Sequence, residues 1–431
     1  MGHRQEPAGG FVRQGRDYRP RAVALRPRRA GAGRIRRTRG ASRGARPRAR
    51  PGARGRRPGA AEYPRAEPDQ PARAGRRGEP QVRGRTVSRL VVYGAGAIGG
   101  QIAVRLANVG LDPLVVEPWD TQREAIQTRG LTMQTEGGGE EHAAPVAIAP
   151  QELSEQVDLL FLCVKSYDTL EALAVIKPWL ADDGFLVSMQ NSINEEWIAP
   201  EVGAERTVGG VILVNGSFLE PGRVQASGSV SRASSTTLPG VYVGEYGAPA
   251  GSNARRVTDV LANVWPAEPV DDLLHERWSK MVNNTMLNPV SAVGGMRSAE
   301  LLANADARRI AVRLAAETMR VSEAEGHPLA RIMGDYDAAD VYANAAGESD
   351  VVERGLAARA ANVGPGAMTS MYQDVRRARK TEVDYFSGLV SGKGAVHGIA
   401  TPYCDAITAL VHRVESGDVT PSAASLRLVD G

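Results

Sequence analysis

One stretch, LVVYGAGAIGG at Leu90–Gly100, constrains the fold of this 431-residue chain more than any other. Four apolar residues lead into glycines spaced G-x-G-x-x-G, and Gln101–Ala107 then places apolar residues at helical spacing. The pattern predicts a strand, a tight turn and a helix. Gly94 would permit the turn, Gly96 would let the backbone approach a pyrophosphate, and Gly99 would let helix and strand pack closely.

The helix after this turn would offer free N–H groups and the positive end of its dipole to phosphates. An ordinary βα turn is the alternative, because the chain holds 48 glycines. The flanking strand and helix favour a dinucleotide site. The residues predicted to bind the cofactor here are Gly94, Gly96, Ala97, Ile98 and Gly99.

Charge divides the chain into two unlike parts. Residues 1–88 hold 25 arginines, no lysine and 6 acidic residues, whereas the remainder holds 28 basic and 43 acidic residues. A segment built from Arg, Gly, Pro and Ala cannot bury enough apolar surface to offset chain entropy, so we expect an Arg/Gly/Pro-rich disordered extension. It is an upstream extension before a start near Val87, a tail without function, or an arginine-rich arm for nucleic acid, although it has few aromatic residues for base stacking. On the first interpretation, deleting residues 1–86 leaves activity and melting temperature unchanged.

Composition also bears on location. No apolar run reaches the roughly 18 residues of a membrane span, and no apolar segment typical of a secretory signal follows the basic start. The two cysteines, Cys163 and Cys404, stand in apolar surroundings and predict buried thiols rather than a disulfide. We therefore expect a cytoplasmic protein without a metal site.

Three further strands are predicted to end in polar residues. Glu117 ends the second strand, 23 residues after Gly94, where an acid would bind the ribose hydroxyls and repel a 2′-phosphate. The alternative is a solvated carboxylate, and Arg123 could still accept a phosphate. Lys165 and Asn191 follow two apolar strands that would end at one sheet edge, so both should line the cofactor crevice.

The residues Pro266–Pro269 give the clearest boundary signal. They separate an α/β dinucleotide-binding domain, 89–269, from a helical domain, 270–431. Within the first domain, Gly228–Ser235 is turn-rich and expected to be exposed. The second is predicted to hold helices around 273–293, 310–325, 332–346 and 351–361.

In the first of these helices, Lys280, Asn284 and Asn288 recur at i, i+4 and i+8 and so share one face. Burying these three polar side chains without polar partners would cost free energy, which favours a functional site. The alternative is that they form a solvated face of an exposed helix. Further on, Ser370 and Glu382 are 12 residues apart and would share an angle on a continuous helix. Ser370 could also cap a helix, and the basic residues between the two are expected to face solvent.

Together these segments resemble the ketopantoate reductases, which are NADPH-dependent 2-ketoacid reductases. The resemblance covers Arg89 to His412 and rests on G-A-G-A-I-G, the Val164-Lys165 and Gln190-Asn191 pairs, W-S-K-M-V-N-N-T-M-L-N-P and S-M-Y-Q-D-V-x-x-x-x-K-T-E-V-D-Y. It implies a Rossmann-type domain followed by an all-α domain of the 6-phosphogluconate-dehydrogenase kind. It also implies reduction of 2-dehydropantoate to pantoate for coenzyme A synthesis.

The resemblance assigns roles to residues. Lys280 would donate a proton to the ketone oxygen, which agrees with the negative charge that hydride addition develops there. Glu382 would position that lysine and contact substrate. Burial would lower the lysine pKa and a neighbouring carboxylate would raise it, which the sequence leaves open. The remaining implied residues are Asn284, Asn288 and Ser370 for substrate, and Lys165 and Asn191 beside the ribose and nicotinamide.

Several positions depart from the family pattern. Ser192 replaces a usual glycine, and Ala367 and Ser387 replace asparagines, which leaves the identity of the 2-ketoacid open. Glu117 stands where many NADPH-using members carry a basic residue. We therefore expect NADH to be accepted at least as well as NADPH.

Two other interpretations remain. An opine or 3-hydroxyacid dehydrogenase would use a His–Glu or His–Asp pair, and His275 is near Lys280 in sequence but off its face. A dinucleotide-sensing or nucleic-acid-binding protein would use residues 1–88. The expected partner is a small-molecule 2-ketoacid, and a homodimer is one arrangement that the sequence leaves open.

Overall fold

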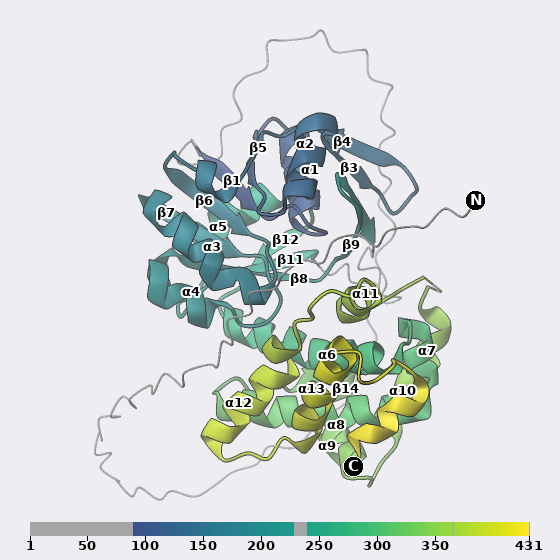
Figure 1. The fold of residues 1–431 in the computed structure, drawn as a ribbon. Coiled ribbons are helices and arrows are strands. Elements are labelled where there is room, and N and C mark those ends of the chain that lie inside the picture. Colours follow the sequence, from purple (N-terminus) through teal and green to yellow (C-terminus); the bar gives the residue numbers. More distant parts are fainter. Residues whose placement is uncertain (1–88, 228–238, 365, 431) are drawn as a thin grey trace, which may run out of the picture. The chain divides into compact units, whose positions relative to one another are not determined.

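The computed structural model describes residues 89–227, 239–364 and 366–430 (Figure 1). Residues 1–88 and the predicted exposed segment Gly228–Ser235 lie outside the described residues. The described part confirms the expected fold class, with an α/β region followed by helices.

A sheet of eight strands organises the first region. Its strand order is β12-β11-β8-β7-β6-β1-β2-β5, and all neighbours are parallel except β8 and β11. The order reverses between β1 and β6, and ligands of such sheets bind outside the carboxyl ends of the strands at this point. The strands are β1 (Leu90–Tyr93), β2 (Leu114–Val116), β5 (Ala147–Ile148), β6 (Val157–Leu162), β7 (Leu180–Ser188), β8 (Thr207–Ile212), β11 (Val241–Glu245) and β12 (Ala267–Pro269).

Both faces of this sheet are covered, as the continuous apolar strands predict. Successive residues of β1 point to opposite faces, so Val91 and Val92 belong to two different apolar clusters and both are fully buried. Helices α1 (Gly99–Asn108), α2 (Asp120–Arg129) and α5 (Ser252–Leu261) contribute to the cluster of Val92, and α3 (Thr169–Ile176) and α4 (Glu195–Val202) to that of Val91.

A second sheet of four strands packs on α1. Its order is β4-β3-β10-β9, and Val224 approaches so closely that a Cβ on Gly100 would lie 2.9 Å from its Cγ1. The strands are β3 (Leu131–Gln134), β4 (Glu140–Ala143), β9 (Asn215–Glu220) and β10 (Arg223–Ser227).

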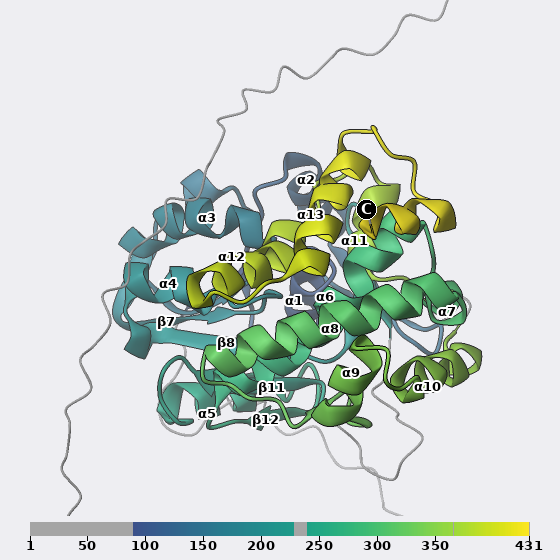
Figure 2. The ribbon, with the colours of Figure 1, turned by 90° about the horizontal axis from the view of Figure 1, so that it is seen from below.

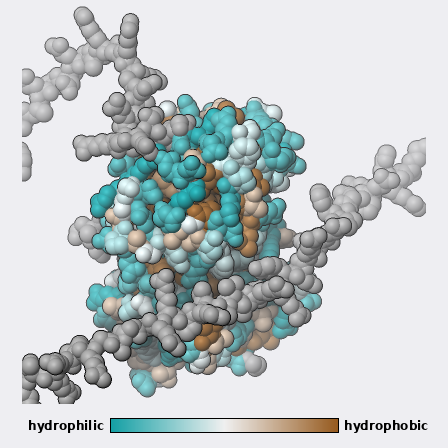
Figure 3. Space-filling view, turned by 90° about the vertical axis from the view of Figure 1, so that its left-hand side faces the viewer, coloured by the Kyte–Doolittle hydropathy of each residue, from teal (hydrophilic) through white to brown (hydrophobic). Residues whose placement is uncertain are grey.

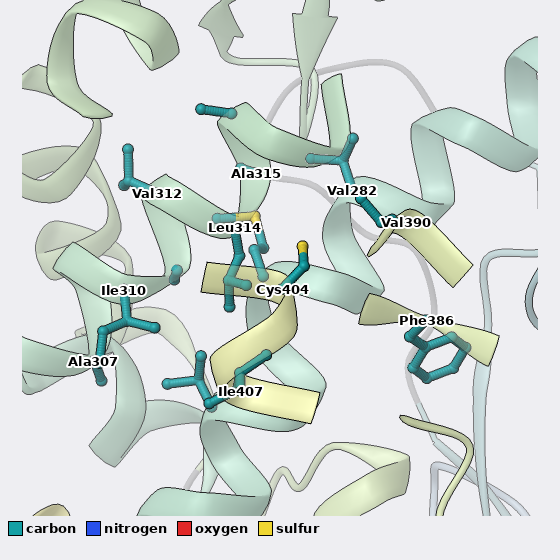
Figure 4. Close-up of a cluster of buried hydrophobic side chains, with 14 of the residues drawn as sticks. Val282, Ala307, Ile310, Val312, Leu314, Ala315, Phe386, Val390, Cys404 and Ile407 are labelled. Carbon is teal, nitrogen blue, oxygen red and sulfur yellow. The ribbon is translucent and has the colours of Figure 1, made fainter. Parts of the chain in front are cut away.

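Helices form the second region, and α8 runs alongside α6 (Figure 2). Their shared core includes Val282 of α6, Leu314 of α8 and Cys404 of α13 (Figure 4). The helices are α6 (Leu273–Gly294), α7 (Ser298–Ala303), α8 (Ala305–Ala324), α9 (Ala338–Ala345), α10 (Val351–Arg359), α11 (Ser370–Arg376), α12 (Ser387–His397) and α13 (Pro402–Glu415). Gly295, in the left-handed conformation, caps the C-terminal end of α6.

Two sequence expectations are wrong in detail. The segment 332–346 is not one helix, because a small hairpin of β13 (Arg331–Ile332) and β14 (Tyr336–Asp337) precedes α9. No continuous helix joins Ser370 to Glu382, because α11 ends at Arg376 and Ala378 has a positive φ of 50°. The shared helical angle therefore does not apply to this pair.

Within the described ranges, no helix combines the length and the apolar character that crossing a bilayer requires. The face drawn in Figure 3 is mostly hydrophilic, with hydrophobic residues showing in smaller patches.

Candidate active site

The glycine turn has the geometry that a pyrophosphate needs. Gly94 has a φ of 90°, and a Cβ on Gly99 would lie 1.9 Å from the Gly94 carbonyl oxygen, so helix and turn could not pack with a larger residue there. A Cβ on Gly96 would meet no atom within 4 Å, so this glycine faces open space. No side chain caps the start of α1 at Ile98. These residues fit a dinucleotide whose phosphates lie at the helix N-terminus.

Glu117 lies directly beside the turn. Its carboxylate is buried and accepts the N–H groups of Ala95 (2.6 Å) and Trp119 (2.9 Å). Burial raises the pKa of this carboxyl, and the two N–H groups oppose that shift. Arg123 donates to the Glu117 carbonyl oxygen and pairs with Asp120, so its guanidinium already has partners.

Lys165 stands just beyond β6 and is held by two carboxylates from the helical region. Its ammonium lies 2.7 Å from Asp374 Oδ2 and 3.0 Å from Glu382 Oε2. The other Glu382 oxygen accepts the backbone N–H and the hydroxyl of Ser166. Burial lowers the pKa of Lys165, but Glu382 and Asp374 outweigh it and raise that pKa above its ordinary value. Lys165 is therefore a fixed cation.

The loop after β7 presents Asn191. Its carbonyl oxygen accepts the Ser166 hydroxyl at 3.3 Å and the Asn194 amide at 2.6 Å, while its own side chain bonds to no described residue. The next residue, Ser192, has a positive φ of 74°, which explains why a glycine would suit this position. Its hydroxyl donates to the Tyr385 carbonyl oxygen at 2.6 Å, a bond that glycine could not make.

Lys280, Asn284 and Asn288 share one face of α6, as predicted, and only some of their polar groups have hydrogen-bond partners. Asn288 Oδ1 accepts the Ser370 hydroxyl at 3.1 Å and the Met371 N–H at 3.3 Å, and its amide donates to Asn284 Oδ1 at 3.2 Å. The Asn284 amide nitrogen is buried and has no partner among the described residues. An unpaired buried donor is costly, so Asn284 has a free hydrogen bond to offer.

Lys280 is partly buried and makes no hydrogen bond or ion pair within the described ranges. Burial lowers its pKa to about 7, the positive charge of Arg277 acts in the same direction, and Glu382 opposes both. Of the two effects that the sequence left open, burial is therefore the stronger. A lysine with this pKa can give up its proton near neutral pH.

The structure brings Glu382 to Lys165 rather than to Lys280. The acid therefore makes no direct hydrogen bond that would orient Lys280. Ser370 is the first residue of α11, and the cap is Thr369, whose side chain accepts the Tyr372 N–H. The basic residues Arg376, Arg377, Arg379 and Lys380 are exposed, as expected. The Arg379 guanidinium also stacks on the Trp119 and Phe218 rings.

Four functional neighbours were missed by sequence reasoning: Ser166, Asn194, Arg277 and Asp374. Asp374 lies inside the S-M-Y-Q-D block, and this position was the available signal. Arg277 precedes Lys280 by three residues, which offered a weaker hint, and nothing marked Asn194. Among the described residues, no group of three or more His, Cys, Asp or Glu side chains could hold a metal ion.

The His–carboxylate alternative finds no support at this site. His275 is in none of the His–carboxylate pairs that the described part of the chain contains. Those pairs are His327–Asp272, His397–Glu325, His412–Asp384 and His412–Glu415.

Family comparison gives two matches. Residues 90–234 match the model described as ketopantoate reductase PanE/ApbA, and residues 272–415 match its C-terminal counterpart. A 2-dehydropantoate 2-reductase of Mesorhizobium japonicum is 31% identical, covering 76% of this chain and 97% of its own length. One from Archaeoglobus fulgidus is 28% identical, covering 77% and 99%.

Solved structures agree on the fold. D-mandelate dehydrogenase with NADH and anilino(oxo)acetate is 26% identical with a TM-score of 0.65, covering 76% of this chain and 99% of its own. A PanE/ApbA family ketopantoate reductase from Ralstonia eutropha is 24% identical with a TM-score of 0.62, covering the same shares. These similarities support a nicotinamide dinucleotide as the cofactor.

Proposed function

The chain belongs to the ketopantoate reductase family, and from this premise we propose that it reduces a 2-ketoacid to a 2-hydroxy acid with a nicotinamide dinucleotide. The first substrate to test is 2-dehydropantoate, which would give pantoate. The observation that carries this proposal is the Lys280 ammonium, which has a pKa of about 7 and no described partner. Such a group is suited to protonate a substrate oxygen.

The chemistry divides between cofactor and protein. The bound nicotinamide supplies the hydride that adds to the ketone carbon. Lys280 then gives its proton to the ketone oxygen, so that a hydroxyl forms and the neutral amine regains a proton from water. The unpaired Asn284 amide would donate to the same substrate, and the bonded pair Asn288–Ser370 would offer polar groups for its carboxylate.

The cofactor would bind at the carboxyl ends of the strands of the eight-stranded sheet. The Gly94–Gly99 turn would hold the pyrophosphate, and Asn191 and Lys165 would lie beside the ribose and nicotinamide. A buried acid beside the turn disfavours a 2′-phosphate, so Glu117 supports use of NADH at least as readily as NADPH.

A second substrate class is a 2-ketoacid with an apolar substituent, such as phenylglyoxylate. The similarity to D-mandelate dehydrogenase favours it. Ala367 also supplies no polar group at a position where an asparagine would be available for a substrate hydroxyl.

The test is oxidation of NADH and of NADPH, followed at 340 nm, with 2-dehydropantoate, phenylglyoxylate and unbranched 2-ketoacids. We expect turnover with at least one 2-ketoacid, and Lys280→Ala should lower kcat by about 10²–10⁴-fold while cofactor binding persists. Turnover of no 2-ketoacid, or full activity of Lys280→Ala, would contradict the proposal. Light scattering measures whether the protein is a homodimer. DNA binding at several salt concentrations, with and without residues 1–86, tests whether the arginine-rich segment binds nucleic acid.

A further inference from the structure

Arg277 is among the largest fully buried side chains of the described residues. It lies on α6, one turn before Lys280, and only 2% of it is exposed. The reaction proposed above does not use it directly.

The guanidinium bonds across to the strand that leads to Asn191. Nη1 donates to the Gln190 carbonyl oxygen at 2.7 Å, and Nη2 donates to the Ser188 carbonyl oxygen at 2.9 Å. Nη2 also forms an ion pair with Glu195, at the start of α4. One side chain therefore ties the helix of Lys280 to both carbonyls that flank the end of β7.

Stability alone does not account for this ion pair. Both charges are buried, and burying an ion pair removes about as much solvation free energy as the pairing returns. Arg277 Nε and Glu195 Oε2 also lack partners among the described residues, so the pair is not fully satisfied. A feature that contributes little net stability and contacts two parts of the site points to a positional role.

We propose that Arg277 is a positioning residue that fixes α6 to the carboxyl end of β7, and so holds Lys280 in register with the Asn191 loop. The bidentate geometry of arginine suits this role, because its planar fork reaches two carbonyls and a carboxylate together. The inference rests on the proposed function for its kinetic consequences only.

The charge of Arg277 provides an independent readout. The charged groups that act on Lys280 are Arg277 on its own helix and Glu382 before the short turn Val383–Tyr385. Glu382 is itself paired with Lys165, which also pairs with Asp374, and Glu195 of α4 pairs with Arg277. Removing the balancing carboxylate should therefore lower the pKa of Lys280, and removing the guanidinium with it should raise that pKa.

The experiment measures the Lys280 pKa by competitive labelling with acetic anhydride across pH, read by mass spectrometry of the peptide. We expect Glu195→Gln to lower it by about 0.5 and Arg277→Met with Glu195→Gln to raise it by about 0.5–1. Glu317→Gln is the matched control, because Glu317 is also a buried carboxylate and accepts the N–H groups of Tyr403 and Cys404 in α13. It should lower the melting temperature without moving the Lys280 pKa.

Arg277→Lys separates position from charge. It keeps the positive charge but loses the planar guanidinium that reaches several acceptors. We therefore expect the Lys280 pKa measured by labelling to stay within about 0.3, while kcat falls about tenfold or more and NADH binds more weakly. An unchanged Lys280 pKa in both Glu195 variants, or an Arg277→Lys variant with wild-type kcat, would overturn the inference. Labelling needs no turnover, so pKa shifts in a protein that reduces no 2-ketoacid would reject the proposed function and leave the charge coupling of Arg277 in place.

Discussion

Lys280→Met tests whether burial of the charged Lys280 side chain lowers the stability of the folded protein. The structure lowers the Lys280 pKa from its ordinary value of 10.5 to about 7, with burial as the main cause. A difference of about 3.5 corresponds to at most about 5 kcal/mol of lost stability at acidic pH. Because water still reaches part of the side chain, we expect roughly 2–3 kcal/mol.

The sign follows from proton binding. Between about pH 7 and pH 10 the unfolded chain keeps the lysine proton that the folded protein releases, so stability rises with pH in this window. Lys280→Met removes that dependence. The variant should lose turnover, gain stability relative to wild type below pH 7, and lose part of that advantage by pH 9.

Urea unfolding at pH 6, 7, 8 and 9 measures the effect, with wild type and Lys393→Met in parallel. Lys393 is the matched control, because its ammonium pairs with Glu196 and Glu325, which raise its pKa despite burial. Lys393→Met should therefore destabilise the protein at every pH. A Lys280→Met variant that is destabilised by the same amount at pH 6 and pH 9 would refute the reasoning.

Three smaller perturbations test other parts of the site. Ser192→Ala should destabilise the protein by about 1 kcal/mol more than Ser192→Gly does, because both lose the hydroxyl bond but only alanine retains the strain of a positive φ; urea unfolding compares the two. Glu117→Gln keeps an acceptor for the turn but removes its charge, so the kcat/KM ratio of NADPH to NADH should rise about tenfold; an unchanged ratio would show that Glu117 does not discriminate. Glu415→Gln weakens the 2.7 Å bond from the Thr381 N–H, which steadies the segment of Glu382; steady-state kinetics should show a several-fold lower kcat with unchanged secondary structure by circular dichroism.

Local patterns predicted most of the fold. The strand before Gly94 and the helix after it were each visible within about ten residues of sequence, because backbone conformation and apolar spacing are local properties. The hairpin before α9 was missed because its two strands are only two residues each. The break after α11 was missed because alanine at Ala378 gives no sign of a positive φ.

The site was less predictable, because its bonds join residues far apart in the chain. Lys165 and Asp374 are separated by 209 positions, yet their side chains lie 2.7 Å apart. Family resemblance named Lys165 and Glu382 but assigned the carboxylate to Lys280, whereas the structure pairs it with Lys165. Pairing of this kind is decided by how the helical region packs on the sheet edge, and a sequence pattern does not encode that distance.

The pairing that does occur explains why two lysines in one site can act differently. Lys165 lies between two carboxylates, so its charge is fixed and it can hold a ligand but is a poor proton donor. Lys280 makes no direct bond to Glu382. Burial and the nearby Arg277 cation lower the pKa of Lys280 more than Glu382 raises it, so Lys280 readily loses its proton. If Glu382 bonded to Lys280 instead, the pKa of that lysine would rise and proton transfer to a ketone oxygen would become harder. Binding Glu382 at Lys165 thus leaves one lysine to hold ligand and the other to donate a proton.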